Sequence, residues 1–456
     1  MSGTNKIVIL GAGESGYGAA VLARKKGFDV FVSDMGEIKT EYRSLLEKNK
    51  FRFEEGKHTE EEILSAGEVI KSPGIPEKAE IIKKLKAKNI PVISEIEFAG
   101  RYTNSKKICI TGTNGKTTTT LLTYHILQKA GLKVGLAGNV GKSFALQVAE
   151  NDFDYYVLEL SSFQLDGMYS FKADVAILLN ITPDHLDRYE YKLQNYIDSK
   201  FRIIQNQTAL DSFIYCDDDT IITEELSKRK IAAQQFPFSI KKEEGMSAFI
   251  KDDQININIQ NQNLHMSIFD LALQGKHNLY NSMASGIAAR VIDIRKDVVR
   301  ESFSDFKNIE HRLEHVMTVH GIEFINDSKA TNINSTWYAL ECMQKPIVWI
   351  VGGVDKGNDY ESLKELVRTK VKAIVCLGVD NQKIIEAYGD IIPDIVETKT
   401  ASDAVKASYE KGRKGDVVLL SPACASFDLF KNYEDRGDQF RKAVLELKKE
   451  VENQLV

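Results

Sequence analysis

The sequence predicts an α/β protein with three domains. A pattern of a short apolar run, a loop of small residues and an amphipathic segment recurs along the chain, and it is typical of buried parallel strands followed by helices. The length of 456 residues is too great for one ordinary core and predicts roughly two to four domains. The recurrences are Ile7–Leu10 before Gly11-Ala12-Gly13, Ile108–Ile110 before Thr111–Gly115, Ile347–Val351 before Gly352-Gly353, Ile374–Leu377 before Gly378, and Val417–Leu420 before Ser421-Pro422-Ala423.

Three such neighbourhoods define the predicted domains. They are a Rossmann-like domain over residues 1–94, a central P-loop ATPase domain over 95–309 and a second Rossmann-like domain over 310–456. The first boundary lies at the start of a helix-like stretch, Ser94–Tyr102, and the last precedes a new strand at Ile322–Ile325.

The stretch Phe213–Leu273 predicts an added β portion in the central domain. Ile255, Ile257 and Ile259 alternate with polar residues, which is the period of a half-exposed antiparallel strand. We therefore expect the central domain to combine a parallel sheet with a small antiparallel sheet.

Composition favours a cytoplasmic protein and leaves small anionic substrates open, because a few lysines and loop amides can hold them locally. The net charge of -5 argues against general nucleic-acid binding, which needs a broad basic surface. Five cysteines without a zinc-type pair are expected to be reduced structural thiols. Met1–Leu10 leads directly into a glycine loop, so it predicts a buried strand and not a signal peptide. No apolar run approaches bilayer length, and we expect a soluble chain.

The first glycine loop, Gly11-Ala12-Gly13-Glu14-Ser15-Gly16, fits the G-x-G-x-x-G pattern and follows a strand. Asp34 ends the next strand, Asp29–Ser33, at the expected offset of about twenty residues. Alone, this pattern suggests a nicotinamide or flavin cofactor, but any nucleotide diphosphate can bind at such a helix start. A redox function would also leave a second phosphate loop unexplained.

That second loop, Thr111-Gly112-Thr113-Asn114-Gly115-Lys116-Thr117-Thr118, is the strongest single signal. It follows the strand Lys107–Ile110 and opens a helix that reaches about Gly131. Lys116 can neutralise outer phosphates and the Thr117 hydroxyl can bind magnesium. An incidental glycine turn is the alternative, because Ile110 stands where the common pattern has glycine.

Glu159 closes the apolar strand Tyr155–Leu160 and could hold magnesium directly or through water. Taken alone, Glu159 is better explained as a solvated residue at the end of a strand than as a metal ligand. The neighbouring phosphate loop is what favours a metal ligand.

These features, in this order, resemble the Mur ligase family over essentially the whole chain. Besides the two glycine loops, the shared motifs are Ser72-Pro73-Gly74, Gly138-Asn139-Val140-Gly141, Glu159–Gln164, Asn180–Tyr189, Gly275–Asn278, Glu310-His311-Arg312, Asn326–Asn332 and Ser421–Ser426 continuing to Gly437. The last two motifs look like the branch of the family that adds D-glutamate.

The resemblance implies an ADP-forming amide ligase of peptidoglycan precursor synthesis. Such an enzyme transfers the γ-phosphoryl group of ATP to the carboxylate of UDP-N-acetylmuramoyl-L-alanine, and the amine of D-glutamate attacks the acyl phosphate. This chemistry is mostly positioning and charge neutralisation. Two Mg²⁺ ions and a monomer are expected. The alternatives are a related ligase with another amino acid, a P-loop small-molecule kinase, and a non-catalytic UDP-sugar-binding protein.

The resemblance also implies which residues form the site. Catalysis would involve Lys116, His185, Lys200 and Arg312. ATP would be bound by Gly112, Thr113, Asn114, Gly115, Lys116, Thr117, Thr118, Asn278, Asn281, Arg312 and Asp327. The UDP substrate would be bound by Glu14, Ser15, Gly16, Asp34, Ser72, Gly74, Asn139, Gln164 and His185. D-Glutamate would be bound by Lys329, Thr331, Lys356, Ser426 and Tyr433. The metal ions would be held by Thr117, Glu159, His185 and Lys200 as a carbamate.

Two of these residues have simpler explanations from the sequence alone. His185 lies in a turn, where it could simply cap Asp184. Lys200 lies in the helix-like stretch Leu193–Ile204, where a lysine is ordinarily solvated. The family's matching lysine is carbamylated, which requires a neutral amine and therefore a lowered pKa.

Overall fold

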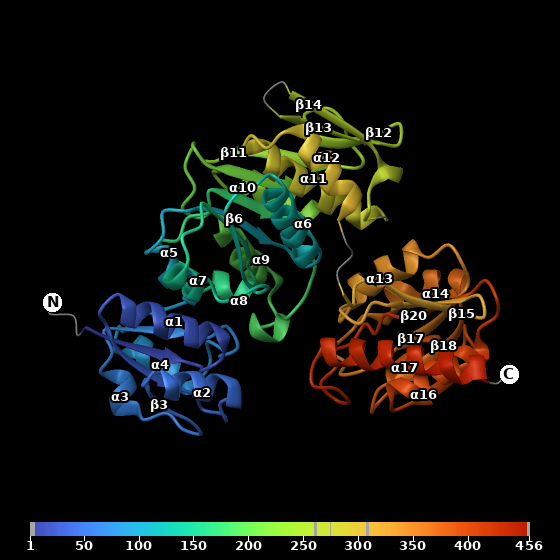
Figure 1. Ribbon diagram of the computed structural model, residues 1–456, viewed down its shortest axis with the longest axis horizontal. Helices are drawn as coiled ribbons and strands as arrows, with labels where there is room; N and C mark the ends of the chain where they lie inside the picture. The colour runs from blue at the N-terminus through green and yellow to red at the C-terminus, as the bar shows by residue number, and fades with distance from the viewer. Residues whose placement is uncertain (1–4, 260–261, 274, 307–309, 454–456) are drawn as a thin grey trace. The chain divides into compact units, whose positions relative to one another are not determined.

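The computed structural model describes residues 5–259, 262–273, 275–306 and 310–453, and they form three sheets (Figure 1). Two compact units divide the chain: residues 1–274 with 278–306, and 275–277 with 307–456. The predicted boundary between residues 309 and 310 borders residues 307–309, which lie outside the described residues.

The N-terminal sheet is parallel throughout, in the order β3-β2-β1-β4-β5. Its strands are β1 (Lys6–Leu10), β2 (Asp29–Ser33), β3 (Arg52–Glu54), β4 (Glu68–Lys71) and β5 (Val92–Ile93). The helices are α1 (Glu14–Lys25), α2 (Thr40–Lys48), α3 (Glu60–Leu64), α4 (Glu80–Ala87) and α5 (Glu95–Gly100). The predicted strand before the first glycine loop and the strand ending next to Asp34 are both confirmed.

The central sheet has the order β14-β13-β12-β11-β10-β9-β6-β8-β7. Its strands are β6 (Lys106–Thr111), β7 (Val134–Gly138), β8 (Tyr155–Glu159), β9 (Val175–Leu178), β10 (Ser212–Cys216), β11 (Gln234–Ser239), β12 (Ala248–Lys251), β13 (Gln254–Ile259) and β14 (Gln262–Ser267). The α-helices are α6 (Lys116–Lys129), α7 (Phe144–Glu150), α8 (Ser162–Leu165), α9 (Leu193–Phe201), α10 (Thr220–Lys228), α11 (Lys276–Val291) and α12 (Lys296–Asp305). Short 3₁₀ turns are η1 (Leu186–Arg188), η2 (Arg202–Ile204) and η3 (Ile268–Asp270).

The antiparallel strand predicted around Ile255, Ile257 and Ile259 is confirmed as β13, which pairs antiparallel with β12 and β14. All three isoleucines are buried. The prediction that this β portion begins at Phe213 is wrong in part, because β10, β11 and β12 continue the parallel sheet. Apolar runs do not by themselves distinguish parallel from antiparallel pairing.

The first two sheets share one hydrophobic core, which is why they fall in one compact unit. This core includes Ile7 and Ile9 of β1, Phe98 of α5 and Phe144 of α7. Helix α1 approaches α7 closely because Gly18 has no side chain: a Cβ there would lie 1.9 Å from the Ser143 hydroxyl oxygen.

The C-terminal sheet has the order β15-β16-β20-β17-β18-β19, and only β15 runs antiparallel to its neighbour. Its strands are β15 (Glu314–Val319), β16 (Ile322–Asn326), β17 (Ile347–Val351), β18 (Val371–Leu377), β19 (Ile395–Thr398) and β20 (Val417–Leu420). The helices are α13 (Ile333–Cys342), η4 (Tyr360–Leu363), α14 (Lys364–Lys370), α15 (Gln382–Tyr388), α16 (Ala401–Lys411) and α17 (Tyr433–Asn453). The predicted strand at Ile322–Ile325 is confirmed as β16, and β15 precedes it.

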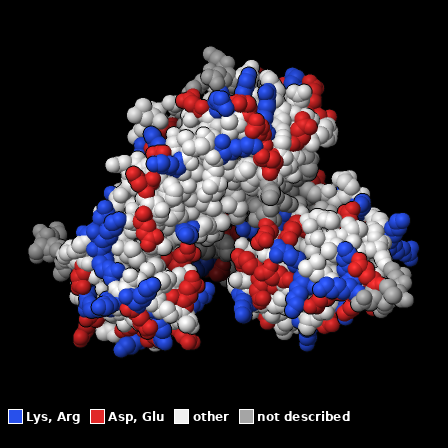
Figure 2. Space-filling model, viewed as in Figure 1, with Lys and Arg blue, Asp and Glu red and all other residues white. Residues whose placement is uncertain are grey.

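Acidic and basic side chains are interspersed over the visible face of each unit (Figure 2). Among the helices of the described residues, none is long and apolar enough to span a bilayer.

Candidate active site

The phosphate loop joins the end of β6 to the start of α6, as predicted. Gly112 has a φ of +151° and Gly115 a φ of +83°, conformations that residues with a Cβ rarely adopt. A Cβ on Gly115 would also lie 2.4 Å from the side-chain oxygen of Asn281. Both glycines are therefore required by the backbone, and the loop leaves amide groups at a helix N-terminus, where phosphates bind.

Asn180, two residues after the end of β9, holds the loop in this shape. Its backbone oxygen accepts a hydrogen bond from the Thr113 amide at 2.9 Å, and its Oδ1 accepts one from the Asn114 amide at 2.8 Å. Its Nδ2 donates to the Asn114 carbonyl at 3.0 Å. Asn180 was not among the predicted site residues. The signal in the sequence was its place after an apolar run, at the start of the Asn180–Tyr189 motif; that its strand pairs with β6 is known only from the structure.

Two lysines meet at the start of this loop. The Lys116 ammonium donates to the carbonyls of Gly112 and Thr113 at 2.9 and 2.7 Å. Lys200 Nζ donates to the same Gly112 carbonyl at 2.8 Å and to Thr111 Oγ1 at 3.2 Å. Lys200 is only 1% exposed, unlike an ordinary surface lysine. Burial holds the pKa of Lys200 well below its usual range, and the positive charge of Lys116 lowers it further.

Glu159 ends β8 and is 2% exposed. Its Oε1 accepts a hydrogen bond from Asn139 Nδ2 at 2.8 Å, whereas its buried Oε2 has no hydrogen-bond partner among the residues that the structure describes. An unpartnered buried carboxylate oxygen is costly, and a hard cation such as Mg²⁺ would satisfy it. Thr117, in the first turn of α6, offers a hydroxyl of the type that P-loops use for Mg²⁺. The residues present therefore fit Mg²⁺.

The described residues contain no cluster of three His, Cys, Asp or Glu side chains that could hold a metal ion. A magnesium site at the phosphate loop thus needs other oxygens, from the Thr117 hydroxyl, from substrate phosphates or from a carbamate on Lys200. Lys200 as a free amine supplies none.

His185 has a φ of +52° and precedes η1. Its backbone amide donates to Asp184 Oδ1 at 2.9 Å, which is the local turn that the sequence suggested as an alternative role. Its ring lies 5.2 Å from the Phe163 ring, edge to face.

Asn278 and Asn281 lie in α11, where both are buried. Asn281 Oδ1 accepts a hydrogen bond from Thr119 Oγ1 at 3.1 Å, and its Nδ2 donates to Asn278 Oδ1 at 3.0 Å. The predicted ATP residues of α11 thus pack against the first turns of α6.

A cavity of about 530 Å³ lies at the first glycine loop. Three predicted UDP-substrate residues, Asp34, Ser72 and Gly74, are among its lining residues. Asp34 Oδ2 accepts the amide of Ala12 at 2.7 Å, so this carboxylate also holds the glycine loop. Gly16 allows close helix–strand packing, since a Cβ there would lie 1.9 Å from the Gly11 carbonyl oxygen.

Two further predicted UDP-substrate residues, Glu14 and Gln164, bond to groups of the protein itself. Glu14 Oε1 accepts the amide of Ser143 at 3.1 Å. Gln164 closes a capping box with Ser161, in which its Oε1 accepts the Ser161 amide at 2.9 Å. Glu14, Ser15 and Gly16 are not among the lining residues of the 530 Å³ cavity.

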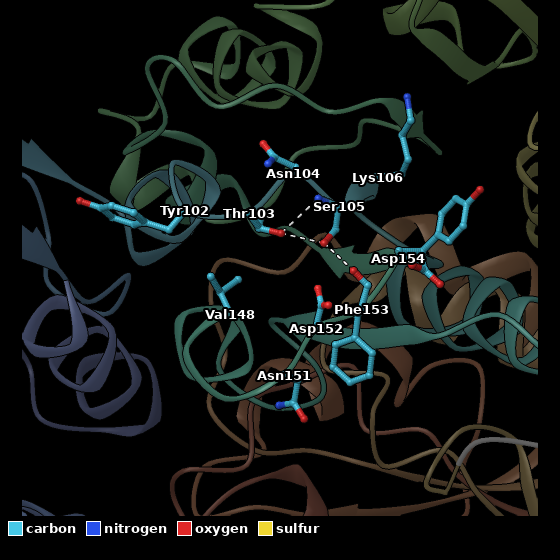
Figure 3. A pocket seen from close by; sticks show the side chains of 11 residues that line it. Tyr102, Thr103, Asn104, Ser105, Lys106, Val148, Asn151, Asp152, Phe153 and Asp154 are labelled. Carbon is cyan, nitrogen blue, oxygen red and sulfur yellow. Dashed lines mark hydrogen bonds between the residues drawn. The ribbon is translucent and has the colours of Figure 1, made fainter.

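A second cavity, of about 510 Å³, lies where β6 and β8 begin (Figure 3). Ser105 bonds Thr103 at 2.7 Å and donates to the Phe153 carbonyl at 2.6 Å, which ties the segments before the two strands together. Ligands of parallel sheets collect at the carboxyl ends of strands. This cavity lies at the amino ends, away from the phosphate loop.

In the C-terminal unit, predicted residues follow the carboxyl ends of β16, β17 and β20. Asp327 is 3% exposed and accepts the hydroxyl of Ser421 at 2.9 Å. Burial raises the pKa of Asp327 to about 6, although Arg312 opposes the shift. Lys329 lies over the Tyr433 ring at 5.3 Å. Ser426 is buried, whereas Lys356 is exposed.

Arg436 is a fully buried cation at the same edge that the site prediction missed. Its guanidinium donates to the Ser328 hydroxyl and carbonyl at 3.0 and 2.9 Å and to the Cys424 carbonyl at 3.3 Å. Burial lowers the pKa of Arg436 to about 10. It therefore holds together the loops after β16 and β20, which carry Lys329 and Ser426.

Three family models match the chain: the Mur ligase middle domain over residues 110–289, the Mur ligase glutamate ligase domain over 311–424 and the MurD N-terminal domain over 6–81. The chain is 59% identical to the UDP-N-acetylmuramoylalanine--D-glutamate ligase of Bacteroides fragilis, over 97% of this chain and 100% of that one. It is 55% identical to the ligase of the same name from Christiangramia forsetii, over 97% of this chain and 99% of that one.

Solved structures of similar fold include the UDP-N-acetylmuramate-alanine ligase MurC from Thermotoga maritima, with a TM-score of 0.63 at 18% identity, covering 97% of this chain and 100% of that one. The MurF ligase from Thermotoga maritima in complex with ADP has a TM-score of 0.60 at 15% identity, covering 98% and 99%. At these identities the likeness concerns the fold.

Proposed function

Because this chain belongs to the Mur ligase family, we propose that it joins D-glutamate to UDP-N-acetylmuramoyl-L-alanine with conversion of ATP to ADP, in peptidoglycan synthesis. One observation carries the choice of substrates: the 59% identity to a D-glutamate ligase extends over 97% of this chain. The pair of lysines at the phosphate loop, half-buried Lys116 and buried Lys200, supports this choice through its chemistry.

A carboxylate is a poor electrophile, so the amide bond requires activation by phosphoryl transfer. Amides of the loop from Gly112 to Gly115 would cradle the phosphates, and the Lys116 ammonium would neutralise charge that develops on the transferred group. Asn278, Asn281, Arg312 and Asp327 would bind the rest of ATP. Bound Mg²⁺, held by Thr117, Glu159, His185 and modified Lys200, would supply further charge neutralisation.

Lys200 supports this role as a carbamate. Carbon dioxide reacts with a neutral amine: the nitrogen lone pair bonds to carbon as one C=O π bond opens onto oxygen, the nitrogen loses one proton to solvent, and the neutral amine becomes a carboxylate-like anion. The buried position and lowered pKa of Lys200 favour the neutral amine. The new oxygens would then supply the ligands that the unmodified site lacks.

The 530 Å³ cavity is our candidate for the UDP part of the acceptor, with Asp34, Ser72 and Gly74 in its lining. Glu14, Ser15, Gly16, Asn139 and Gln164 would complete the UDP-substrate site. For D-glutamate we propose Lys329, Thr331, Lys356, Ser426 and Tyr433, since two lysines suit a dicarboxylate. We also propose domains over residues 1–94, 95–309 and 310–456, a monomeric enzyme, and the cytoplasm, which provides ATP, as its location.

The test is to incubate the full chain with UDP-N-acetylmuramoyl-L-alanine, ATP and magnesium, and to add D-glutamate, L-alanine or a diamino acid separately. We expect phosphate release and a product heavier by one glutamyl residue with D-glutamate only. Product formation with another amino acid would favour a related ligase. A phosphorylated product without an amide would favour a kinase.

A further inference from the structure

Arg188 connects the loop of His185 to the wall of the UDP-substrate cavity. Arg188 is the last residue of η1 and lies three residues after His185. This turn belongs to the part of the first unit that is built on the central sheet. Its Nη2 donates to the Pro73 carbonyl at 3.3 Å, and its Nη1 donates to the Gly74 carbonyl at 3.4 Å. Ser72 and Gly74 both line the 530 Å³ cavity. One side chain therefore spans the two sheets of this unit at the candidate site.

An aromatic ring orients this guanidinium. Arg188 Cζ lies 4.5 Å from the centre of the Phe163 ring. The same ring contacts His185 edge to face at 5.2 Å and stacks on Tyr189 at 6.1 Å. A planar guanidinium packs on such a ring while its N–H groups point outward, which an ammonium cannot imitate. Phe163 thus holds Arg188 and His185 in a fixed relation.

The loop that Arg188 contacts has its own internal support. Lys71 Nζ donates to the Ile75 carbonyl at 2.8 Å and pairs with Glu77 at 3.2 Å. The Ile75 amide donates to the Ser72 carbonyl at 3.1 Å. Because the loop is braced from within, bonds to Pro73 and Gly74 position it as one piece.

We propose that Arg188 is a positioning residue for the UDP-linked substrate: it fixes the Ser72–Gly74 wall of the cavity relative to His185 and thereby sets where the acceptor carboxylate arrives. This inference rests on the proposed function. ATP and D-glutamate are expected to bind through other residues, so the effect of Arg188 falls selectively on the UDP-linked substrate.

The experiment compares Arg188→Ala and Arg188→Lys with the unchanged chain, with each substrate varied in turn. We expect the KM for UDP-N-acetylmuramoyl-L-alanine to rise about tenfold in Arg188→Ala, a typical loss for hydrogen bonds from a charged donor. The KM values for ATP and D-glutamate should stay within about twofold. Arg188→Lys should recover only part of the loss, because it keeps the charge without the planar pair of donors.

Arg202→Lys is the matched control. Arg202 also donates to backbone carbonyls, those of Leu165 and Met168, and lies over an aromatic ring, Tyr169, at 5.4 Å. All of these contacts lie within the part built on the central sheet, so the KM for the UDP substrate should be unchanged. Melting temperatures of all variants identify any general loss of folding.

An unchanged KM for the UDP substrate in Arg188→Ala, or an equal rise for all three substrates, would overturn the proposal. Calorimetric binding of UDP-N-acetylmuramoyl-L-alanine without ATP gives the same comparison without catalysis. If the unchanged chain binds this compound but forms no amide, the proposed function fails. The ratio of the dissociation constants of Arg188→Ala and the unchanged chain then still decides the role of Arg188. If the unchanged chain does not bind it, both are overturned.

Discussion

Gly115 should be the most sensitive position of the phosphate loop to a single added methyl group. Its φ of +83° is strained for alanine, and the new Cβ would lie 2.4 Å from Asn281 Oδ1. Gly131, just beyond the other end of α6, has a φ of +78°, and no atom of the described residues lies within 4 Å of such a Cβ. The backbone cost of alanine is roughly 1–2 kcal/mol at either position, but only Gly115 has a neighbour in the way.

Gly131→Ala should therefore lower the free energy of unfolding by roughly 1–2 kcal/mol and leave catalysis unchanged. Gly115→Ala should lose about 1 kcal/mol more, because Asn281 must move and its 3.1 Å bond from Thr119 is broken. The moved atoms belong to the proposed ATP site. We expect the KM for ATP to rise at least about tenfold, which corresponds to about 1.4 kcal/mol.

The assay measures phosphate release at varied ATP, together with the melting temperature of both variants. A melting temperature below that of Gly131→Ala, together with a raised KM for ATP in Gly115→Ala alone, would support the reasoning. Equal KM values for ATP in the two variants would refute it, because the clash with Asn281 would then have no consequence for the site.

Three further predictions concern buried polar groups. Asn139→Ala removes the 2.8 Å bond that orients Glu159, and the Mg²⁺ concentration for half-maximal activity should rise about tenfold in a magnesium titration. Burial raises the pKa of Glu95 from 4.5 to about 7, so its contribution to stability is complete below pH 4.5 and is lost as the pH rises through about 7. Glu95→Gln should thus have the same melting temperature as the unchanged chain at pH 4.5 but a higher one at pH 8, where its free energy of unfolding should exceed that of the unchanged chain by roughly 3 kcal/mol at most. Equal melting temperatures of the two chains at both pH values would contradict this. Lys200→Ala should lose nearly all activity, and the carbon-13 carbamate resonance of the unchanged chain should fade as the pH falls through the lowered pKa of Lys200, because a protonated amine does not react.

Much of the fold could be predicted because parallel strands leave continuous apolar runs in the sequence. Each predicted run before a glycine loop is a buried strand, including β1, β6 and β17. Strand β15 was missed because its residues before Val319 are half-buried or exposed and give no such run. The shared core of the first two sheets could not be predicted either, since the contact of α1 with Ser143 depends on tertiary packing at Gly18.

The site was predictable where its residues are consecutive in the sequence, as in the loop from Gly112 to Thr117. The site could not be predicted where segments that are distant in the sequence come together. Helical periodicity assigns Lys200 to a face of α9 but does not reveal that this face lies beneath Gly112. Likewise, nothing in the local sequence of Asn180 or Arg436 shows that their side chains brace loops from other strands.

The most direct test of the account follows oxygen from the acceptor substrate. UDP-N-acetylmuramoyl-L-alanine labelled with ¹⁸O in its carboxylate is incubated with ATP, magnesium and D-glutamate, and the released phosphate is analysed by mass spectrometry. We predict one ¹⁸O atom in the phosphate from the unchanged chain and no labelled phosphate from Lys116→Ala. Unlabelled phosphate from the active chain, or undiminished transfer by Lys116→Ala, would contradict carboxylate activation at this loop.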